Sequence, residues 1–285
     1  MNETFSAGAV AVITGGASGI GRAAARRCAA AGMRIAIVDV NDDKLARTRD
    51  ELAGTIGPDH VTAERIDVSD AAALVALAGR IEAQWGAPSL LMNNAAAFVS
   101  GGAGGILDPL ETWQKLFAIN VFGPINGVQA FLPGMLRAGK RARIVNTGSK
   151  QGLTNPPGNP AYNTTKAAVN AYTQNLQRDL RERESSKVSA HLLIPGWTTT
   201  GDAAHKPGAW LPEQVIAFMA EALERDDFFI LCPDDETPNA IDRKRIVWNA
   251  LDVALNRPAL SRWHPDYKDA FARFMHQDLP AGFGG

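Results

Sequence analysis

Tyr162 and Lys166 are the two residues of this sequence whose types and spacing best suit proton transfer. On a helix, residues four apart lie on one face, one turn from each other. An ammonium beside a tyrosine favours the phenolate, and lowering a pKa of about 10 by about three units takes roughly 4 kcal/mol. Ser149 follows a predicted strand, so its hydroxyl could reach the same substrate oxygen. The three would form an acid–base site for an alcohol or a carbonyl, unless the pair merely occupies a surface helix.

The elements that would position these residues can be predicted from apolar runs that alternate with helical stretches. Buried strands are predicted at residues 10–14, 34–38, 61–66, 89–92, 143–147, 188–194 and 228–231. Helices are predicted at residues 19–31, 42–52, 70–84, 111–136, 163–183 and 212–223. The alternation predicts an α/β fold of the Rossmann type, in which helices cover both faces of a doubly wound parallel sheet.

Helix-disrupting residues refine this prediction at two places. Gly123-Pro124 lies inside the long fourth helix and predicts a kink there. Pro156, Pro157 and Pro160 indicate that no helix lies between the fifth strand and Tyr162.

Residues 14–21, Thr-Gly-Gly-Ala-Ser-Gly-Ile-Gly, join the first strand to the first helix. Glycines allow a tight turn and a close approach to a pyrophosphate, whose charge the helix N-terminus can meet. A strand–turn–helix setting is the one that such a motif requires. We therefore expect a dinucleotide cofactor to contact this loop through Gly15, Ser18, Gly19, Ile20 and Gly21.

Asp39 ends the second strand and indicates which dinucleotide is bound. A carboxylate there can bind both ribose hydroxyls and repel a 2′-phosphate. Ser18 and Val40 stand where a 2′-phosphate would need a cation. The cofactor is therefore predicted to be NAD, with NADP less favoured. The alternative is that Asp39 only caps the loop.

Composition limits the partners. The chain has 285 residues, 46% hydrophobic and 21% charged, with a net charge of −1. This composition fits a globular protein. The small net charge creates no long-range electrostatic field that would attract nucleic acid or an anionic membrane. There is neither an apolar run near about 18 residues nor a signal-peptide pattern, so no membrane partner and a cytoplasmic location are expected. Cys28 and Cys232 indicate buried thiols, and no metal site is expected.

These motifs resemble the short-chain dehydrogenase/reductase family, in family order, over roughly residues 8–232. Residues 14–21 look like its cofactor motif, and Asp67-Val68 looks like its adenine-contacting pair. Residues 93–96, Asn-Asn-Ala-Ala, are similar to its Asn-Asn-Ala-Gly motif, with Ala96 in place of the glycine. The resemblance implies that Asn94 and Ala95 also contact the cofactor.

The catalytic part of the resemblance adds one more residue to the site. Asn120 matches the helix asparagine of the family's tetrad, beside Ser149, Tyr162 and Lys166. The resemblance implies that Tyr162 is the general acid/base, that Lys166 lowers its pKa and holds the nicotinamide ribose, and that Ser149 orients the substrate oxygen. Asn120 would keep a water in a proton relay. The segment resembling the nicotinamide side of the site supplies Pro195, Gly196, Thr198 and Thr200.

Three loops follow strand ends and are expected to shape the substrate pocket: residues 98–107, 150–160 and 197–211. Phe98, Gln151, Trp197 and Trp210 are the candidate lining residues, and they favour an apolar or aromatic substrate. The tryptophans could instead be ordinary loop anchors.

The chain is expected to form a single domain, with a core of about residues 8–232 and a helical extension of about residues 233–285. Helices are predicted near 240–255 and 265–276 in the extension. The extension could cap its own active site or pack on a neighbouring subunit. The family resemblance implies a homodimer or homotetramer.

The sequence thus predicts an NAD-dependent enzyme that interconverts a secondary alcohol and a ketone or aldehyde, acting on a small molecule and not on nucleic acid. Two alternatives stay open. One is an NAD-binding sensor or regulator on the same fold, since fold does not fix function. The other is an epimerase or dehydratase that recycles its NAD.

Overall fold

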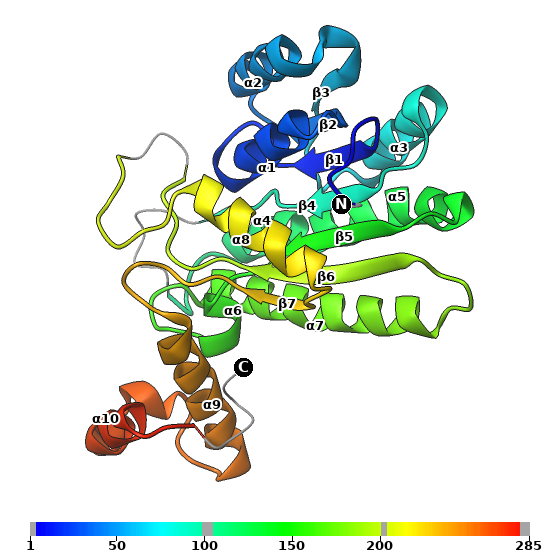
Figure 1. The fold of residues 1–285 in the computed structure, drawn as a ribbon. Coiled ribbons are helices and arrows are strands. Elements are labelled where there is room, and N and C mark those ends of the chain that lie inside the picture. Colours follow the sequence, from blue (N-terminus) through cyan, green and yellow to red (C-terminus); the bar gives the residue numbers. More distant parts are fainter. Residues whose placement is uncertain (1–3, 99–104, 201–203, 280–285) are drawn as a thin grey trace.

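In the computed structural model, which describes residues 4–98, 105–200 and 204–279, seven strands form one parallel sheet (Figure 1). The strand order is β3-β2-β1-β4-β5-β6-β7. Their bounds are β1 (Val10–Thr14), β2 (Arg34–Asp39), β3 (Val61–Arg65), β4 (Leu90–Asn93), β5 (Ala142–Thr147), β6 (Val188–Ile194) and β7 (Phe229–Leu231). The predicted doubly wound α/β fold is confirmed.

Helices cover both faces of this sheet. One face is covered by α1 (Gly19–Ala30), α2 (Asp42–Ile56) and α8 (Pro212–Glu224), whose buried residues share one apolar cluster. The other face is covered by α3 (Ala71–Trp85), α5 (Gly123–Ala138) and α7 (Pro160–Glu182). The remaining elements of this part are η1 (Pro58–His60), α4 (Leu110–Phe117), η2 (Ala118–Phe122) and α6 (Gln151–Thr154).

Strand β1 shows why the chain folds into this sandwich of layers. Its side chains alternate between the two faces, so Val10 and Val12 enter one apolar cluster while Ala11 and Ile13 enter the other. All five of its residues are buried. Full burial of a side chain such as Ile13 contributes about 1.5–3 kcal/mol, so an unbroken apolar run is stable only between two helical layers.

The strand order reverses beside β1, which pairs with β2 on one side and β4 on the other. In open parallel sheets this switch point leaves a crevice at the carboxyl ends of the strands. Thr14, Asn93, Thr147 and Ile194 end their strands at this same edge. The loops that carry the candidate site residues therefore start side by side.

The long fourth helix departs from its prediction in detail. Helices α4 and α5 are joined by a π-helical turn, η2, directly before the predicted kink at Gly123-Pro124. Proline at position 124 has no N–H, so the chain cannot make the ordinary hydrogen bond four residues back to Asn120. A wider turn at this point is the physical consequence.

Helix α6 contradicts the prediction that no helix lies between the fifth strand and Tyr162. Gln151–Thr154 forms one helical turn before the prolines begin, and Asn155 ends it in a left-handed conformation. Pro160 opens α7 at its first turn, where a missing N–H costs nothing. The prolines therefore delimit two helices and do not exclude both.

The joined helix Leu110–Ala138 is long and apolar enough to cross a membrane, since an 18-residue window within it has a mean hydropathy of 1.2. Val128, Phe131 and Met135 on this helix pack in the cluster that also holds Leu77 and Ile81 of α3. A core helix meets the same criteria of length and composition. These contacts identify it as part of the layer that covers the sheet.

The extension contains α9 (Asn239–Ala254), η3 (Ser261–Trp263), η4 (Pro265–Tyr267) and α10 (Lys268–His276). It projects from the edge of the molecule near α6 and β7 (Figure 1). Trp248 is its buried centre, with Phe271 and Phe274 each 5.2 Å from it between ring centroids. The predicted helices are present, and their apolar faces pack on one another.

Candidate active site

The loop between β1 and α1 contains glycines at positions where a side chain would be strained or would approach neighbouring atoms too closely. Gly15 and Gly19 have φ of 64° and 50°, a region that favours glycine. A Cβ at Gly21 would overlap the Gly15 carbonyl. Ser18 sits at the N-cap without making a side-chain cap, and the first turn has no acidic residue. This arrangement, with Ile20 in the first turn, fits a pyrophosphate at the helix N-terminus.

Asp39 holds this loop in place from the end of β2. Its carboxylate accepts hydrogen bonds from the backbone N–H of Ala17 at 3.2 Å, Val40 at 2.8 Å and Asn41 at 3.2 Å. The loop-capping role is therefore present in the structure. A carboxylate has about four acceptor positions, so this role leaves capacity for a ribose hydroxyl.

Asp67 and Val68, which follow β3, are held by contacts with Ser69 and with α5. The Asp67 carboxylate accepts hydrogen bonds from the Ser69 N–H and hydroxyl, at 2.9 and 2.8 Å. Val68 is buried against Gly123, where a Cβ would approach its side chain to 2.6 Å, and its carbonyl accepts from Asn126 at 3.0 Å. Gly123 thus lets α5 approach this segment closely.

The segment after β4 is pinned to β1 and β5. The backbone N–H groups of Asn94 and Ala95 donate to the Thr14 hydroxyl at 2.9 and 3.1 Å. The Asn94 side-chain oxygen accepts from the Thr147 hydroxyl at 3.3 Å. Ala96, which replaces the glycine of the resembling motif, does not adopt a positive φ, so alanine introduces no backbone strain there.

The structure brings Ser149, Tyr162 and Lys166 together. Lys166 is buried, its ammonium donates to the Thr147 carbonyl at 2.8 Å, and the ammonium nitrogen lies 5.7 Å from the centroid of the Tyr162 ring. Burial lowers the pKa of Lys166 to about 8. Burial raises the pKa of Tyr162, and a hydrogen bond with Ser149 acts against this rise. The Ser149 oxygen also accepts the Gln151 N–H at 3.2 Å.

Asn120 lies in η2, and its side chain is engaged in three hydrogen bonds. Its amide oxygen accepts from the Ala97 N–H at 2.7 Å, and its amide nitrogen donates to the Ala97 carbonyl and the Thr165 hydroxyl. The side chain therefore fastens the segment after β4 to α7. Its own carbonyl lacks the usual helical partner because Pro124 has no N–H.

The segment after β6 reaches the glycine-rich loop between β1 and α1. Pro195 is buried, and the Thr198 hydroxyl donates to the Gly196 carbonyl at 3.1 Å. The Thr200 side chain lies 3.3 Å from the position that a Cβ on Gly19 would occupy. Two of the cofactor segments predicted from distant parts of the sequence are thus in contact.

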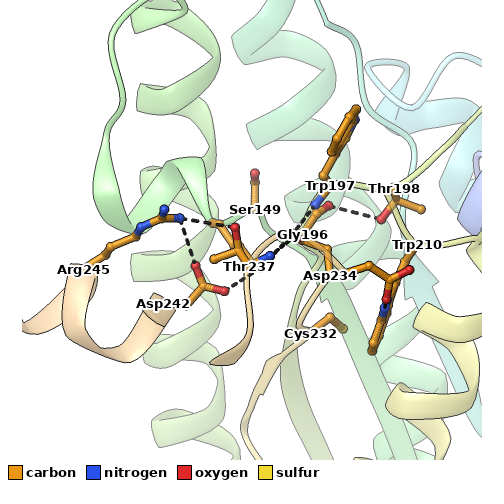
Figure 2. Close-up of polar contacts among 12 residues, drawn as sticks. Ser149, Gly196, Trp197, Thr198, Trp210, Cys232, Asp234, Thr237, Asp242 and Arg245 are labelled. Carbon is orange, nitrogen blue, oxygen red and sulfur yellow. Dashed lines mark hydrogen bonds and ion pairs between the residues drawn. The ribbon is translucent and has the colours of Figure 1, made fainter. Parts of the chain in front are cut away.

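Of the four candidate pocket residues, three lie near Ser149 or Tyr162. The Phe98 ring packs edge-on to Tyr162 at 4.9 Å. The Gln151 side-chain oxygen is buried without a hydrogen-bond partner in the protein. Trp197 points to the same side as Ser149, and 43% of its surface is exposed (Figure 2). The parts of the predicted pocket loops at 99–104 and 201–203 lie outside the described residues.

Trp210 points the other way (Figure 2). Its indole N–H donates to Asp235 at 2.9 Å, and its ring packs on Phe218 of α8 at 6.0 Å. It is a loop anchor in this structure, which was the alternative left open for the tryptophans.

Cys28 and Cys232 are buried free thiols, as predicted, and burial raises the pKa of each to about 12. Within the described part of the chain, no group of three or more histidine, cysteine, aspartate and glutamate side chains could hold a metal ion.

Sequence reasoning missed a second set of buried polar residues beside Ser149. Lys150 forms ion pairs with Asp234 and Asp242, and Arg245 lies 3.8 Å from Asp242. The available sequence signal was the acidic run Asp234-Asp235-Glu236 that follows the last strand.

Comparison with known proteins identifies the class of this fold and site. Residues 9–208 match the family described as short chain dehydrogenase, so the chain belongs to the short-chain dehydrogenase/reductase family. It is 30% identical to 1-deoxy-11-beta-hydroxypentalenate dehydrogenase of Streptomyces exfoliatus, over 89% of this chain and 93% of that protein. It is 33% identical to 2,5-dichloro-2,5-cyclohexadiene-1,4-diol dehydrogenase LinX of Sphingobium indicum, over 73% of this chain and 80% of that protein.

Solved structures give the same result. A short chain dehydrogenase/reductase from Burkholderia phymatum in complex with NAD is 32% identical, with a TM-score of 0.78 over 89% of this chain and 96% of that chain. LigO from Sphingobium sp. strain SYK-6 is 26% identical, with a TM-score of 0.74 over 98% of this chain and 99% of that chain. The chain is thus an oxidoreductase of a family that binds a nicotinamide cofactor.

Proposed function

We propose that this protein is an NAD-dependent dehydrogenase or reductase that interconverts a secondary alcohol and a ketone or aldehyde. The observation that carries the proposal is the placement of the buried Lys166 beside the Tyr162 ring, with Ser149 hydrogen-bonded to the Tyr162 side chain. Every position that the reaction needs is filled by a residue with suitable chemistry.

Tyr162 is the general acid/base in this proposal. When a carbonyl is reduced, its hydroxyl donates the proton to the substrate oxygen; when an alcohol is oxidised, the phenolate takes that proton. Burial raises the pKa of Tyr162, so the protein alone keeps the hydroxyl protonated. The Lys166 ammonium, beside the ring, is the group of this chain that favours the phenolate.

Ser149 and Asn120 support the proton transfer. Ser149 holds the substrate oxygen near the Tyr162 hydroxyl. Asn120 offers its backbone carbonyl to a water that connects Lys166 with solvent, because its side chain is already bonded to Ala97 and Thr165. The nicotinamide supplies the chemistry of hydride transfer at its C4 when the cofactor is bound.

The cofactor would be held by residues that end or follow five strands, β1, β2, β3, β4 and β6, and by two residues of α7. Gly15, Ser18, Gly19, Ile20 and Gly21 would meet the pyrophosphate, and Asp39 the adenosine ribose. The adenosine half would be contacted by Asp67, Val68, Asn94 and Ala95. The nicotinamide half would be held by Tyr162, Lys166, Pro195, Gly196, Thr198 and Thr200. The NAD complex of the similar Burkholderia phymatum protein supports this proposal.

The substrate is proposed to be an apolar or aromatic small molecule. Phe98 packs on the catalytic tyrosine, and the exposed Trp197 faces the same side of the site. Both rings offer apolar surface next to the reacting oxygen. The buried and unpaired Gln151 oxygen could accept one hydrogen bond from the substrate.

The test is the near-ultraviolet absorbance of NADH during incubation with secondary and aromatic alcohols, run in parallel with NADP. Turnover with NAD is expected, and a preference for NADP would contradict the role of Asp39. Asp39→Asn keeps one acceptor for the loop but removes the charge, so discrimination against NADP should fall by about tenfold or more. Tight NAD binding without turnover on any alcohol or carbonyl would instead favour a sensor.

A further inference from the structure

The turn after β7, which we call the acidic turn (residues 234–237), forms hydrogen bonds with the loop that follows β6 (residues 197–211). The Asp234 carboxylate accepts the Trp197 N–H at 3.0 Å, and the Asp235 carboxylate accepts the Trp210 indole N–H at 2.9 Å. Glu236 donates its N–H to the Gly208 carbonyl at 3.2 Å. Three consecutive residues therefore hold both ends of residues 197–211.

Lys150 connects this turn to the catalytic serine and to the extension. Its ammonium lies 2.8 Å from Asp234 and 2.5 Å from Asp242, the latter on α9. The lysine side chain is 15% exposed, and the two carboxylates are 4% and 5% exposed. Since Lys150 is covalently joined to Ser149, a buried ion pair ties the catalytic residue to α9.

Two further contacts strengthen the connection. A Cβ on Gly196 would collide with both the Asp234 carboxylate and the Lys150 side chain. The absence of a side chain at position 196 therefore leaves the space in which Lys150 and Asp234 form their ion pair. Asn249 of α9 donates to the Leu153 carbonyl of α6 at 3.0 Å. Figure 2 shows Asp242 and Arg245 of α9 next to Thr237 of the acidic turn.

The charges within this cluster are balanced. Lys150 and Arg245 supply two positive charges, and Asp234 and Asp242 supply two negative ones. Burial tends to raise the pKa of Asp234, but Lys150 and the Trp197 and Thr237 N–H groups outweigh it and hold that pKa below its usual value. Removing one member leaves a buried charge without its partner, so the segments it joins must rearrange.

We propose that Lys150 is a positioning residue through which the C-terminal extension fixes Ser149 and the Gly196–Trp197 backbone at the active site. The extension thereby acts in cis, on its own catalytic centre, through the ion pair between Lys150 and Asp242. The kinetic part of this inference rests on the proposed function; the structural part does not.

Two buried aspartates of α9 provide the variant and its matched control. Asp242→Asn breaks the connection to Lys150. Asp252→Asn breaks an ion pair of similar burial that stays within the extension, where Asp252 contacts Arg257 at 2.8 Å and Ser261 at 2.5 Å. Both substitutions are expected to lower thermal stability, so stability alone cannot separate them.

The first readout is hydrogen exchange of the backbone amides at residues 196–200, measured by mass spectrometry on the full chain. The Trp197 N–H is protected by Asp234, so exchange should accelerate in Asp242→Asn and in Lys150→Met but not in Asp252→Asn. Lys150→Arg keeps a donor that can reach both carboxylates and should restore protection. Equal exchange in the two aspartate variants would overturn the inference.

The second readout is kinetic. A small displacement of reacting groups is costly, so kcat should fall about tenfold or more in Asp242→Asn, with the NADH dissociation constant within about threefold. Asp252→Asn should keep its kcat within about twofold. An equal loss of kcat in both variants would mean that the extension acts only through stability. A wild-type chain without turnover would defeat the proposed function alone, and hydrogen exchange would still decide the positioning role.

Discussion

At the scale of single residues, the sequence predicted which side chains lie together when their types and their spacing along one helix were enough to show it. Tyr162 and Lys166 could be paired because a helix brings residues four apart to one face. Lys150 could not be found this way, because Asp234 and Asp242 reach it from the far end of the sheet and from the extension. The direction of the Tyr162 pKa was also beyond the sequence, since it follows from burial. Trp210 shows the same limit, because only its neighbours reveal which way it points.

Lys166 gives a prediction for stability as a function of pH. Its pKa falls from 10.5 to about 8 on burial. Between these values the unfolded chain binds more protons at this group, so its contribution to stability rises with pH, and the charged form is destabilising below about pH 8. Lys166→Met removes that term. The gain in unfolding free energy of Lys166→Met over wild type should therefore be larger at pH 7 than near pH 10, by about 2.5 kcal/mol.

Urea denaturation of both proteins across this pH range measures the difference directly. Taking the difference between variant and wild type removes the contributions of Cys28 and Cys232, which titrate in the same range and occur in both proteins. The lost hydrogen bond to Thr147 adds an offset that should not vary with pH. Parallel stability curves would show that Lys166 is not destabilised by burial.

At the scale of elements, the strands were predictable because each is an apolar run between turn residues. All five residues of β1 are buried, which agrees with its unbroken apolar sequence. Helix α6 was missed because one turn of helix is too short to show a periodic pattern, and nearby prolines suggested the opposite. The π-helical turn η2 was anticipated only as a kink. Its cause, the missing N–H of Pro124, was in the sequence, but the form of the distortion depends on how Asn120 is held.

The close packing of the loop between β1 and α1 can be tested at Gly21 of α1, with Gly79 of α3 as the control glycine. Gly21→Ala places a methyl group against the Gly15 carbonyl and should lower the unfolding free energy by about 1–3 kcal/mol and weaken NADH binding. Gly79→Ala on α3 meets nothing within 4 Å and should raise the unfolding free energy by about 0.5–1 kcal/mol. Denaturation and NADH fluorescence titration would measure both effects. Similar behaviour of the two variants would contradict the close contact at Gly21.

At the scale of the whole molecule, the parallel sheet and its two helical layers followed from the alternation of elements and the right-handed crossover rule. The helices of the extension followed from the helical stretches predicted near 240–255 and 265–276. How the extension attaches did not, because it depends on ion pairs and hydrogen bonds between residues about 90 positions apart, such as Lys150 with Asp242 and Leu153 with Asn249. The extension packs beside α6, on the same chain as the site that we propose it supports.

The predicted homodimer or homotetramer is tested at this scale. Leu110 and Phe122 on the long helix and Phe229 on the edge strand are 66%, 55% and 52% exposed, and burying such side chains against a second copy would favour association. Light scattering coupled to size-exclusion chromatography should give about two or four times the chain mass of 30.4 kDa. A mass of one chain at micromolar concentration would refute this prediction.

The central claim is that the site around Tyr162 moves a hydride between a substrate carbon and a nicotinamide, and isotope transfer tests it most directly. An alcohol that is turned over would be labelled with deuterium at its carbinol carbon, and the cofactor analysed by mass spectrometry. We predict one deuterium in each NADH formed by the wild type, and a rate lower by about a hundredfold or more in Tyr162→Phe at saturating cofactor. NADH without deuterium, or undiminished transfer in Tyr162→Phe, would contradict the claim.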